Sequence, residues 1–334
     1  MNKKGIAVAG NMIVDMLYPI NGFPKPGELT TITADAARST GGCLCNDVMD
    51  LSLLDPDMPL TALGRVGQDA AGEFVLGRLR ERKNIDLSQI KREGTTSFTF
   101  VMADELTKQR TFFHCRGANA LFCEEDINWD ALNADILHIG YILLLDALDA
   151  PDAEYGTKMA RLLRSAKERG ILTSIDVVTE AGERFKRIVS PALRYTDYCV
   201  INESEAQAVT GVPLTDGNGR IIRENVPAAL RELKRLGVSR WAVIHCPEGG
   251  FGLDERGVFA EIKSLKLGKD YIKGTVGAGD AFCSGVLYGA WREMSLEESL
   301  KLGTAAAACS LSQPGATEGM RSCAEAMALY EKLR

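Results

Sequence analysis

The sequence lacks the residue patterns of zinc hydrolases and of disulfide-stabilised proteins. It has 3 histidines, at positions 114, 138 and 245, and no His-Glu-x-x-His motif, so little supports a zinc hydrolase. None of its 9 cysteines forms a Cys-x-x-Cys pair. An odd number of cysteines in a chain of 334 residues indicates reduced thiols and a cytoplasmic protein. Cys43 and Cys45 offer two soft metal ligands, but such a pair more commonly consists of buried or loop thiols.

Long apolar runs and basic runs are also missing. Because no 18-residue apolar stretch occurs, we expect no membrane-spanning helix, and the apolar run Gly5–Gly10 is too short for a signal peptide. A net charge of −6 without a basic cluster argues against a nucleic-acid partner. With 46% hydrophobic and 25% charged residues, the composition is that of an ordinary globular protein. The length suits one large α/β domain.

Two common phosphate-binding motifs are absent, and a third glycine-rich stretch is present instead. Phe282 occupies the third glycine position of a Rossmann motif, and the only Gly-Lys pair is followed by Asp270 where a Walker A motif needs Ser or Thr. Gly277–Asp280 lies directly before an expected helix, Ala281–Arg292. Free N–H groups at a helix start favour a phosphate, and Asp280 beside it could accept a proton from a hydroxyl. Alternatively, Asp280 is an ordinary N-cap.

Alternation of strand-like and helical runs predicts a mostly parallel sheet with helices on both faces. Ligands bind such sheets at the carboxyl ends of the strands. In the first half, the expected strands are 5–9, 28–36, 60–66 and a hairpin of 95–103 with 109–115. The expected helices there are 48–54 and 71–82. In the second half, the expected strands are 136–139, 171–176, 198–201 and 241–245, and the expected helices are 154–169, 182–194, 226–236 and a small-residue helix over 305–315.

The stretch around Asp280 resembles the C-terminal signature of the ribokinase-like (PfkB) family of sugar and nucleoside kinases, usually Asp-Thr-x-Gly-Ala-Gly-Asp. Thr275 and Gly277–Asp280 match this signature. The resemblance implies an α/β, ribokinase-like three-layer fold and a phosphotransferase that uses ATP and Mg²⁺ and acts on an alcohol group. It implies that Asp280 is the catalytic base. Gly277, Ala278 and Gly279 would form the anion hole, and Thr275 and Gly279 would contact the nucleotide.

The signature departs from the family at one position, where Gly274 replaces the first Asp. In many members this Asp helps to build a monovalent-cation site. Because glycine offers only its carbonyl oxygen, a monovalent cation is doubtful here, and we expect weak or absent activation by K⁺.

On the substrate side, further motifs follow in the order that the family shows. Gly41 to Asn46 matches Gly-Gly-x-x-x-Asn, which implies that Gly42 and Asn46 contact the sugar. The resemblance also assigns sugar hydroxyls to Asp15 and places Arg110 and Asn119 near the substrate. Structural roles stay open for three of these residues: a turn for Asp15, a helix cap for Asn46 and an exposed hairpin charge for Arg110.

On the nucleotide side, Asn202 and Glu205 match an Asn-x-x-Glu motif, which implies that they hold Mg²⁺ and phosphates, partly through water. A helix cap explains the same pair equally well. Gly250 matches the last glycine of the Thr-x-Gly-x-x-Gly stretch that binds the nucleotide in the family, and His245 stands in place of its Thr. The resemblance implies that both contact the nucleotide. Pro247 replaces the first glycine of that stretch and removes an N–H, which leaves these contacts in doubt.

The resemblance implies one domain over residues 1–334 with a small β-sheet lid made from segments 16–38 and 95–116. Such a lid often pairs two subunits, so we expect a homodimer. We predict an ATP-dependent kinase for a small sugar. The alternatives are a nucleoside kinase of the same family and a sugar-binding protein with little catalysis, the latter motivated by Gly274 and Pro247. The motifs do not distinguish one sugar from another.

Overall fold

The first strand already separates two hydrophobic layers. In the computed structural model, which describes residues 4–107, 109–179, 184–268 and 270–334, β1 (Ile6–Gly10) is buried along its whole length. Ile6 and Val8 pack into one core, whereas Ala7 and Ala9 pack into the other. Alternate side chains of a strand point to opposite faces, so a continuous apolar run produces a strand that is covered on both sides.

The large sheet runs through both halves of the chain. Its central pairs, from β14 to β5, are parallel, and an antiparallel hairpin of β15 and β16 extends one edge. In spatial order the strands are β16 (Phe259–Lys263), β15 (Gly249–Leu253), β14 (Trp241–Cys246), β13 (Tyr198–Asn202), β12 (Leu172–Val177), β9 (Ile136–Ile142), β1, β4 (Leu60–Val66) and β5 (Ile85–Asp86), and β6 (Ile90–Arg92) also pairs with β4.

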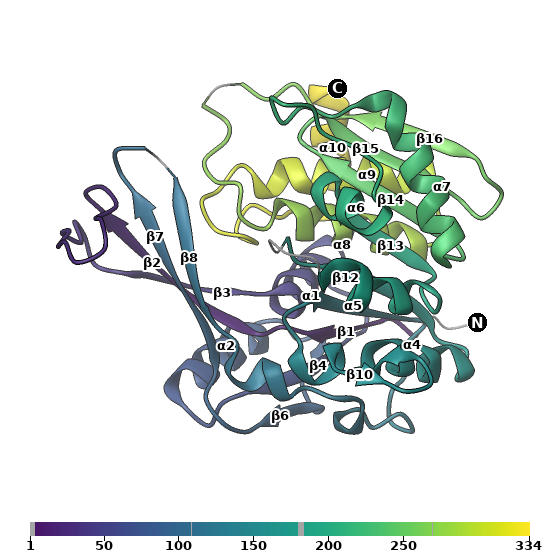
Figure 1. Ribbon diagram of the computed structural model, residues 1–334, viewed down its shortest axis with the longest axis horizontal. Coiled ribbons are helices and arrows are strands. Elements are labelled where there is room, and N and C mark those ends of the chain that lie inside the picture. The colour runs from purple at the N-terminus through teal and green to yellow at the C-terminus, as the bar shows by residue number, and fades with distance from the viewer. Residues whose placement is uncertain (1–3, 108, 180–183, 269) are drawn as a thin grey trace.

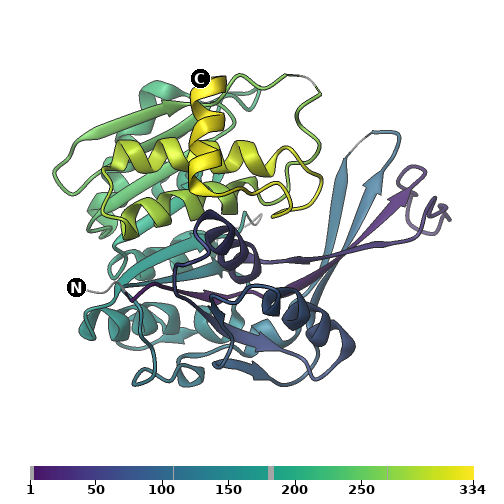
Figure 2. The same cartoon turned by 180° about the vertical axis from the view of Figure 1, so that it is seen from behind.

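Helices cover both faces of this sheet, which makes three layers (Figures 1 and 2). One face carries α1 (Cys43–Leu54), α2 (Ala70–Arg80), α8 (Ala278–Trp291), α9 (Leu296–Ser310) and α10 (Cys323–Leu333). The other face carries α3 (Asp146–Asp149), α4 (Lys158–Glu168), α5 (Arg184–Leu193), α6 (Glu203–Thr210) and α7 (Val226–Leu236). The predicted α/β architecture with a mostly parallel sheet is therefore confirmed.

A separate four-stranded sheet projects from one side of the three layers (Figure 1). Its order is β3 (Ala37–Gly41), β2 (Ile13–Ile20), β7 (Ser97–Asp104) and β8 (Arg110–Cys115), and β7 with β8 forms the expected hairpin. The predicted strand over 28–36 is wrong, because only Ile32 pairs there, in an isolated bridge to Ile20. The strand that follows the turn begins later, at Ala37.

Element boundaries differ from the predictions where a cap or a turn decides them. Helix α4 begins at Lys158 and not at residue 154, because the Thr157 side chain caps it and the preceding residues pair as β10 (Pro151–Asp152) with β11 (Gly156–Thr157). The small-residue helix expected over 305–315 is the end of α9, which stops at Ser310. Residues 182 and 183 of the helix expected over 182–194 lie outside the described residues. No helix in the described ranges has the length and apolarity needed to cross a membrane.

Candidate active site

Asp280 lies in the first turn of α8 and is not its N-cap. The helix begins at Ala278, three residues earlier than the apolar pattern indicates, because Gly277 caps it with a left-handed backbone (φ 76°). A Cβ at Gly277 would lie 2.6 Å from the Cβ of Ala316, so this position requires glycine. The free N–H groups of the first turn and the Asp280 carboxylate therefore meet at one place.

The Asp280 carboxylate is buried and held from two sides. The Asn46 amide donates to one oxygen at 2.8 Å, and the Tyr141 hydroxyl donates to the other at 2.7 Å. Burial, with the charge of the nearby Asp47 carboxylate next, raises the pKa of Asp280 from 3.8 to about 7, although the two hydrogen bonds act to lower it. A group with a pKa near neutrality is suited to accept a proton during a reaction.

Two adjoining cavities meet beside Asp280. The larger has a volume of about 510 Å³ and the smaller about 250 Å³, and His245 and Gly279 line both. Predicted residues that line the larger cavity are His245, Thr275, Ala278 and Gly279. Predicted residues that line the smaller cavity are Asn202, Glu205, His245, Gly279 and Asp280. The structure thus brings the predicted nucleotide and catalytic residues together.

His245 forms the wall between the two cavities. Its ring packs on Phe282 with the centroids 5.1 Å apart, and a Cβ at Gly279 would lie 3.2 Å from its Cε1 atom. Burial lowers the pKa of His245 to about 4, so the imidazole is neutral at physiological pH. It can offer a hydrogen bond but no charge to a phosphate.

The predicted nucleotide loop is a tight turn between β14 and β15. Pro247 lines the larger cavity without filling it. Gly250 does not line either cavity; it pairs with His245, and a Cβ there would lie 2.6 Å from the Phe282 ring. Gly250 therefore lies outside the two cavities, and the absence of a side chain there leaves room for the Phe282 ring.

Asn202 and Glu205 form a capping box at the start of α6, as the alternative reading predicts. The Asn202 side chain accepts from the Glu205 N–H at 2.9 Å, and the Glu205 carboxylate accepts from the Asn202 N–H at 2.9 Å and from the Thr179 hydroxyl at 2.8 Å. Burial raises the pKa of Glu205 to about 7. Asp176 lies in the same cavity, and burial, with the Glu205 charge next, raises its pKa well above the usual value. A bound cation would compensate these carboxylates, and oxygen ligands of this kind suit Mg²⁺.

On the substrate side, Asp15 and Gly42 lie next to each other. Asp15 lies within β2, so it is not a turn residue, and its carboxylate lies over Gly41, where a Cβ would be 2.1 Å away. Gly42 caps α1 with a φ of 88°, and a Cβ there would lie 2.5 Å from the Asn11 carbonyl oxygen. Asn46 lies inside α1 and is not a cap. Its hydrogen bond to Asp280 joins this side of the site to the buried carboxylate.

Two predicted substrate residues are not brought to this site. Asn119 is fully buried, and its amide bonds the N–H and the carbonyl of Met12 at 3.1 and 3.2 Å, so it positions the backbone before β2. Arg110 pairs with Ala103 near the hairpin tip, four residues along the strands from the level of Asp15. That spacing corresponds to about 13 Å.

Comparison with known proteins decides the family. The family model described as "pfkB family carbohydrate kinase" matches residues 3–323. The chain belongs to this family. The kinase is 24% identical over 339 residues to a ribokinase of Haemophilus influenzae, a match that covers 98% of this chain and 99% of the relative. It is 24% identical over 214 residues to a bifunctional ribokinase/ribose-5-phosphate isomerase A of Fructilactobacillus sanfranciscensis, covering 64% of this chain and 37% of that protein.

The fold of the kinase matches solved structures of the same class. A ribokinase of Arabidopsis thaliana, complexed with ribose and ATP, superposes with a TM-score of 0.80 at 21% identity, covering 98% of this chain and 99% of that one. This likeness confirms the predicted ribokinase-like fold with a large parallel sheet and a small second sheet. As a member of the family, the kinase is a phosphotransferase of the carbohydrate kinase class.

The kinase departs from its family at Gly274 for a steric reason. A Cβ at this position would lie 2.7 Å from the carbonyl oxygen of Pro314 and 2.9 Å from that of Gln313. The chain after α9 therefore occupies the space into which the aspartate of the family signature would extend.

Sequence reasoning missed three polar residues of the kinase site: Tyr141, Asp176 and Thr179. Tyr141 and Asp176 lie near the carboxyl ends of β9 and β12, and Thr179 follows β12. The rule that ligands bind at the carboxyl ends of parallel strands could have found them. Tyr141 lies just after an expected strand, and Asp176 ends one.

Proposed function

We propose that this kinase transfers the γ-phosphoryl group of ATP to a hydroxyl of a small sugar. The observation that carries the proposal is the position of Asp280. It is a buried carboxylate with a pKa of about 7, in the first turn of α8, where two cavities adjoin. A general base must reach the hydroxyl while the helix N-terminus holds the phosphate, and this arrangement supports both.

In the proposed reaction, Asp280 accepts the proton of the substrate hydroxyl as its oxygen attacks the γ-phosphorus. The bond from that phosphorus to the β-phosphate oxygen breaks, and ADP leaves. N–H groups of Gly277–Asp280 stabilise the negative charge of the transferred group. Tyr141 and Asn46, which donate to the two Asp280 oxygens, hold the carboxylate in one orientation.

The larger cavity is the proposed ATP site. One wall is apolar and suits an adenine ring; it is formed by Leu265, Leu267, Ile272, Ala307, Ala308 and Leu311. His245 and Gly279, which line both cavities, would contact the phosphates where they pass toward Asp280. Asn202, Glu205 and Asp176 would hold Mg²⁺, partly through water, and the ion would supply charge neutralisation for the phosphates when bound.

Asp15, Gly42 and Asn46 form the proposed sugar side of the site. We assign the small sheet as a lid over it, within one domain of residues 1–334, so that closure excludes competing water. Exposed apolar side chains cluster on this sheet and its loops and support a homodimer through the lid; they are Phe23, Leu29, Ile32, Leu106, Phe112 and Phe113. The reduced-thiol composition supports a cytoplasmic location.

The decisive experiment is ATP turnover with Mg²⁺ over a panel of sugars, sugar acids and nucleosides, starting with ribose. Turnover of one class, lost in Asp280→Asn, supports the proposal and names the substrate. If only nucleosides are turned over, the substrate of this kinase is a nucleoside and not a sugar. If no compound is turned over, calorimetry decides between the remaining interpretations. A chain that binds a sugar but no ATP is a sugar-binding protein.

A further inference from the structure

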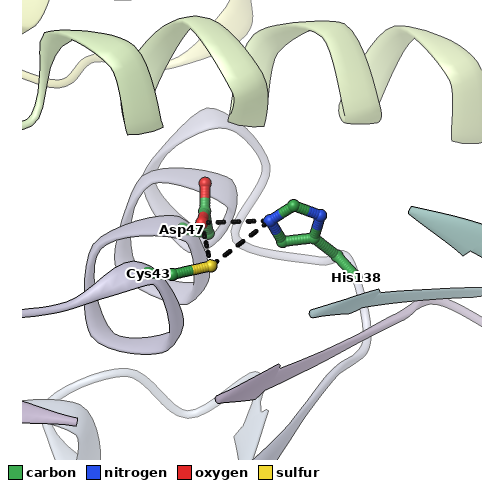
Figure 3. Close-up of side chains that lie close together, drawn as sticks. All are labelled: Cys43, Asp47 and His138. Carbon is green, nitrogen blue, oxygen red and sulfur yellow. Dashed lines mark hydrogen bonds and ion pairs between the residues drawn. The ribbon is translucent and has the colours of Figure 1, made fainter. Parts of the chain in front are cut away.

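Three side chains with metal-binding atoms meet in the core beneath α8 (Figure 3). The Cys43 sulfur lies 3.2 Å from Asp47 Oδ2 and 3.4 Å from His138 Nε2, and Asp47 Oδ2 lies 3.4 Å from the same nitrogen. All three residues have 0% of their surface exposed. In the proposed mechanism none of them touches substrate or nucleotide.

The three come from two elements that pack against α8. Cys43 and Asp47 are one helical turn apart on α1 and therefore share a face, and His138 lies in the middle of β9. A fourth group comes from α8, because the Cys283 sulfur lies 3.9 Å from His138 Nε2. The ligand atoms of Cys43, Asp47 and His138 all lie within 4.8 Å of one another, whereas the Cys283 sulfur lies next to this group, on the side of His138.

These separations match the edges of a tetrahedral zinc site. With Zn–S near 2.3 Å and Zn–N and Zn–O near 2.0–2.1 Å, ligand atoms lie about 3.3–3.6 Å apart. The three observed separations of 3.2, 3.4 and 3.4 Å fall close to this range. Hydrogen bonds alone do not require three such atoms to be equidistant.

Two serine hydroxyls contact the outer atoms of His138 and Asp47, so that His138 Nε2 and Asp47 Oδ2 face the cluster. Ser174 Oγ lies 2.9 Å from His138 Nδ1, and Ser284 donates to Asp47 Oδ1 at 2.8 Å. If Nδ1 carries the proton, Nε2 points its lone pair into the cluster, and Asp47 Oδ2 does the same. Outer partners of this kind orient metal ligands in zinc proteins.

We propose that Cys43, Asp47 and His138 form a buried zinc site, and that rotation of the Cys283 side chain, whose sulfur lies beside His138, brings in the fourth ligand. A divalent ion would balance the charges of the Cys43 thiolate and the Asp47 carboxylate, which are costly to bury separately. Zn²⁺ is the fitting ion because it accepts mixed sulfur, nitrogen and oxygen ligands in tetrahedral geometry. The site would fasten α1 and β9 to α8, one turn from Asp280, independently of which substrate the kinase uses.

The first test is the metal content of the full chain produced in zinc-supplemented medium. Because the site has no exposed surface, zinc must enter during folding, and EDTA in the final column should remove only surface metal. We expect about one zinc ion per chain to remain. Production with Co²⁺ instead should give a thiolate-to-cobalt charge-transfer band and the intense visible bands of tetrahedral cobalt. Less than about a tenth of an ion per chain, or cobalt without the charge-transfer band, would overturn the proposal and leave a hydrogen-bonded cluster of Cys43, Asp47 and His138.

Variants test which residues hold the ion. Cys43→Ser and His138→Gln should lose the zinc, whereas Cys45→Ser, another buried thiol on α1, should retain it. Refolding gives a second readout that stands even if a variant folds poorly. Wild-type protein refolded with zinc should unfold at a higher temperature than protein refolded with EDTA, because the ion binds only the folded chain. Equal unfolding temperatures, or zinc retained by Cys43→Ser, would refute the site.

Discussion

Replacing Asp280 by asparagine removes a proton acceptor and keeps the size of the side chain. General bases contribute about 10²- to 10⁴-fold to rate, so we expect kcat to fall by that factor. The KM for ATP should change little, because Asp280 lines the smaller cavity and not the larger one.

The same substitution should leave the fold intact. Because burial raises the pKa of Asp280 from 3.8 to about 7, its contribution to the free energy of unfolding is greatest below 3.8 and is lost as pH rises through about 7. Asparagine stays neutral and escapes that loss, but its NH₂ group faces a donor from Asn46 or Tyr141. An unpaired buried donor costs about 1–3 kcal/mol. At pH 8 this cost opposes the gain from staying neutral, which is about 4 kcal/mol for a pKa raised from 3.8 to about 7, so the variant should be no less stable than the wild type.

Two assays separate these effects. Initial rates of ADP formation on the sugar identified by the panel give kcat, and thermal unfolding at pH 8 gives stability. In the wild type, kcat/KM should fall about tenfold per pH unit below an apparent pKa near 7, because protonated Asp280 cannot act as the base. Asp280→Asn should lack this acid limb. A variant that keeps more than a tenth of the wild-type kcat, or keeps the limb, would refute the assignment of Asp280 as base.

Three further predictions concern its neighbours. Tyr141→Phe removes a donor that lowers the pKa of Asp280, so the acid limb should move to higher pH; an unmoved limb would contradict the contact. Burial lowers the pKa of His245 to about 4, so titration of this imidazole should cause no inflection of the KM for ATP near pH 6.5, the ordinary histidine pKa. His245→Ala should raise the KM for ATP. Gly274→Asp should cost about 1–3 kcal/mol in denaturant unfolding through overpacking against Pro314, and exchange of Na⁺ for K⁺ at constant ionic strength should leave the wild-type rate unchanged. A Gly274→Asp variant that is stable and activated by K⁺ would show that the segment around Pro314 moves to accommodate the aspartate.

Local sequence patterns predicted much of the fold, because apolar residues recur every two residues in a strand and every three to four in a helix. The apolar runs of β1, β4 and β14 identify strands, since alternate side chains enter two cores. Boundaries were less predictable. The start of α8 depends on the left-handed backbone of Gly277. The spacing of apolar residues gives no information on the backbone angles of a single residue.

The candidate site divides in the same way. Asp280 and the capping box of Asn202 and Glu205 were predictable, because helix-start residues carry a local signal. The sequence did not indicate where Arg110 and Asn119 lie, because strand register places Arg110 opposite Ala103 and the contact with Met12 fixes Asn119. Sequence spacing does not contain that information.

By itself, the sequence determined the family and the layered α/β architecture, and it singled out Asp280 as the proposed base, because each is carried by residues close together in the chain. Only the tertiary structure decided which groups surround that base. Asn46 precedes Asp280 by 234 residues and Tyr141 precedes it by 139, yet both form hydrogen bonds with its carboxylate. Cys43, Asp47 and His138 meet for the same reason, since packing of α1 and β9 under α8 creates contacts that no local pattern encodes.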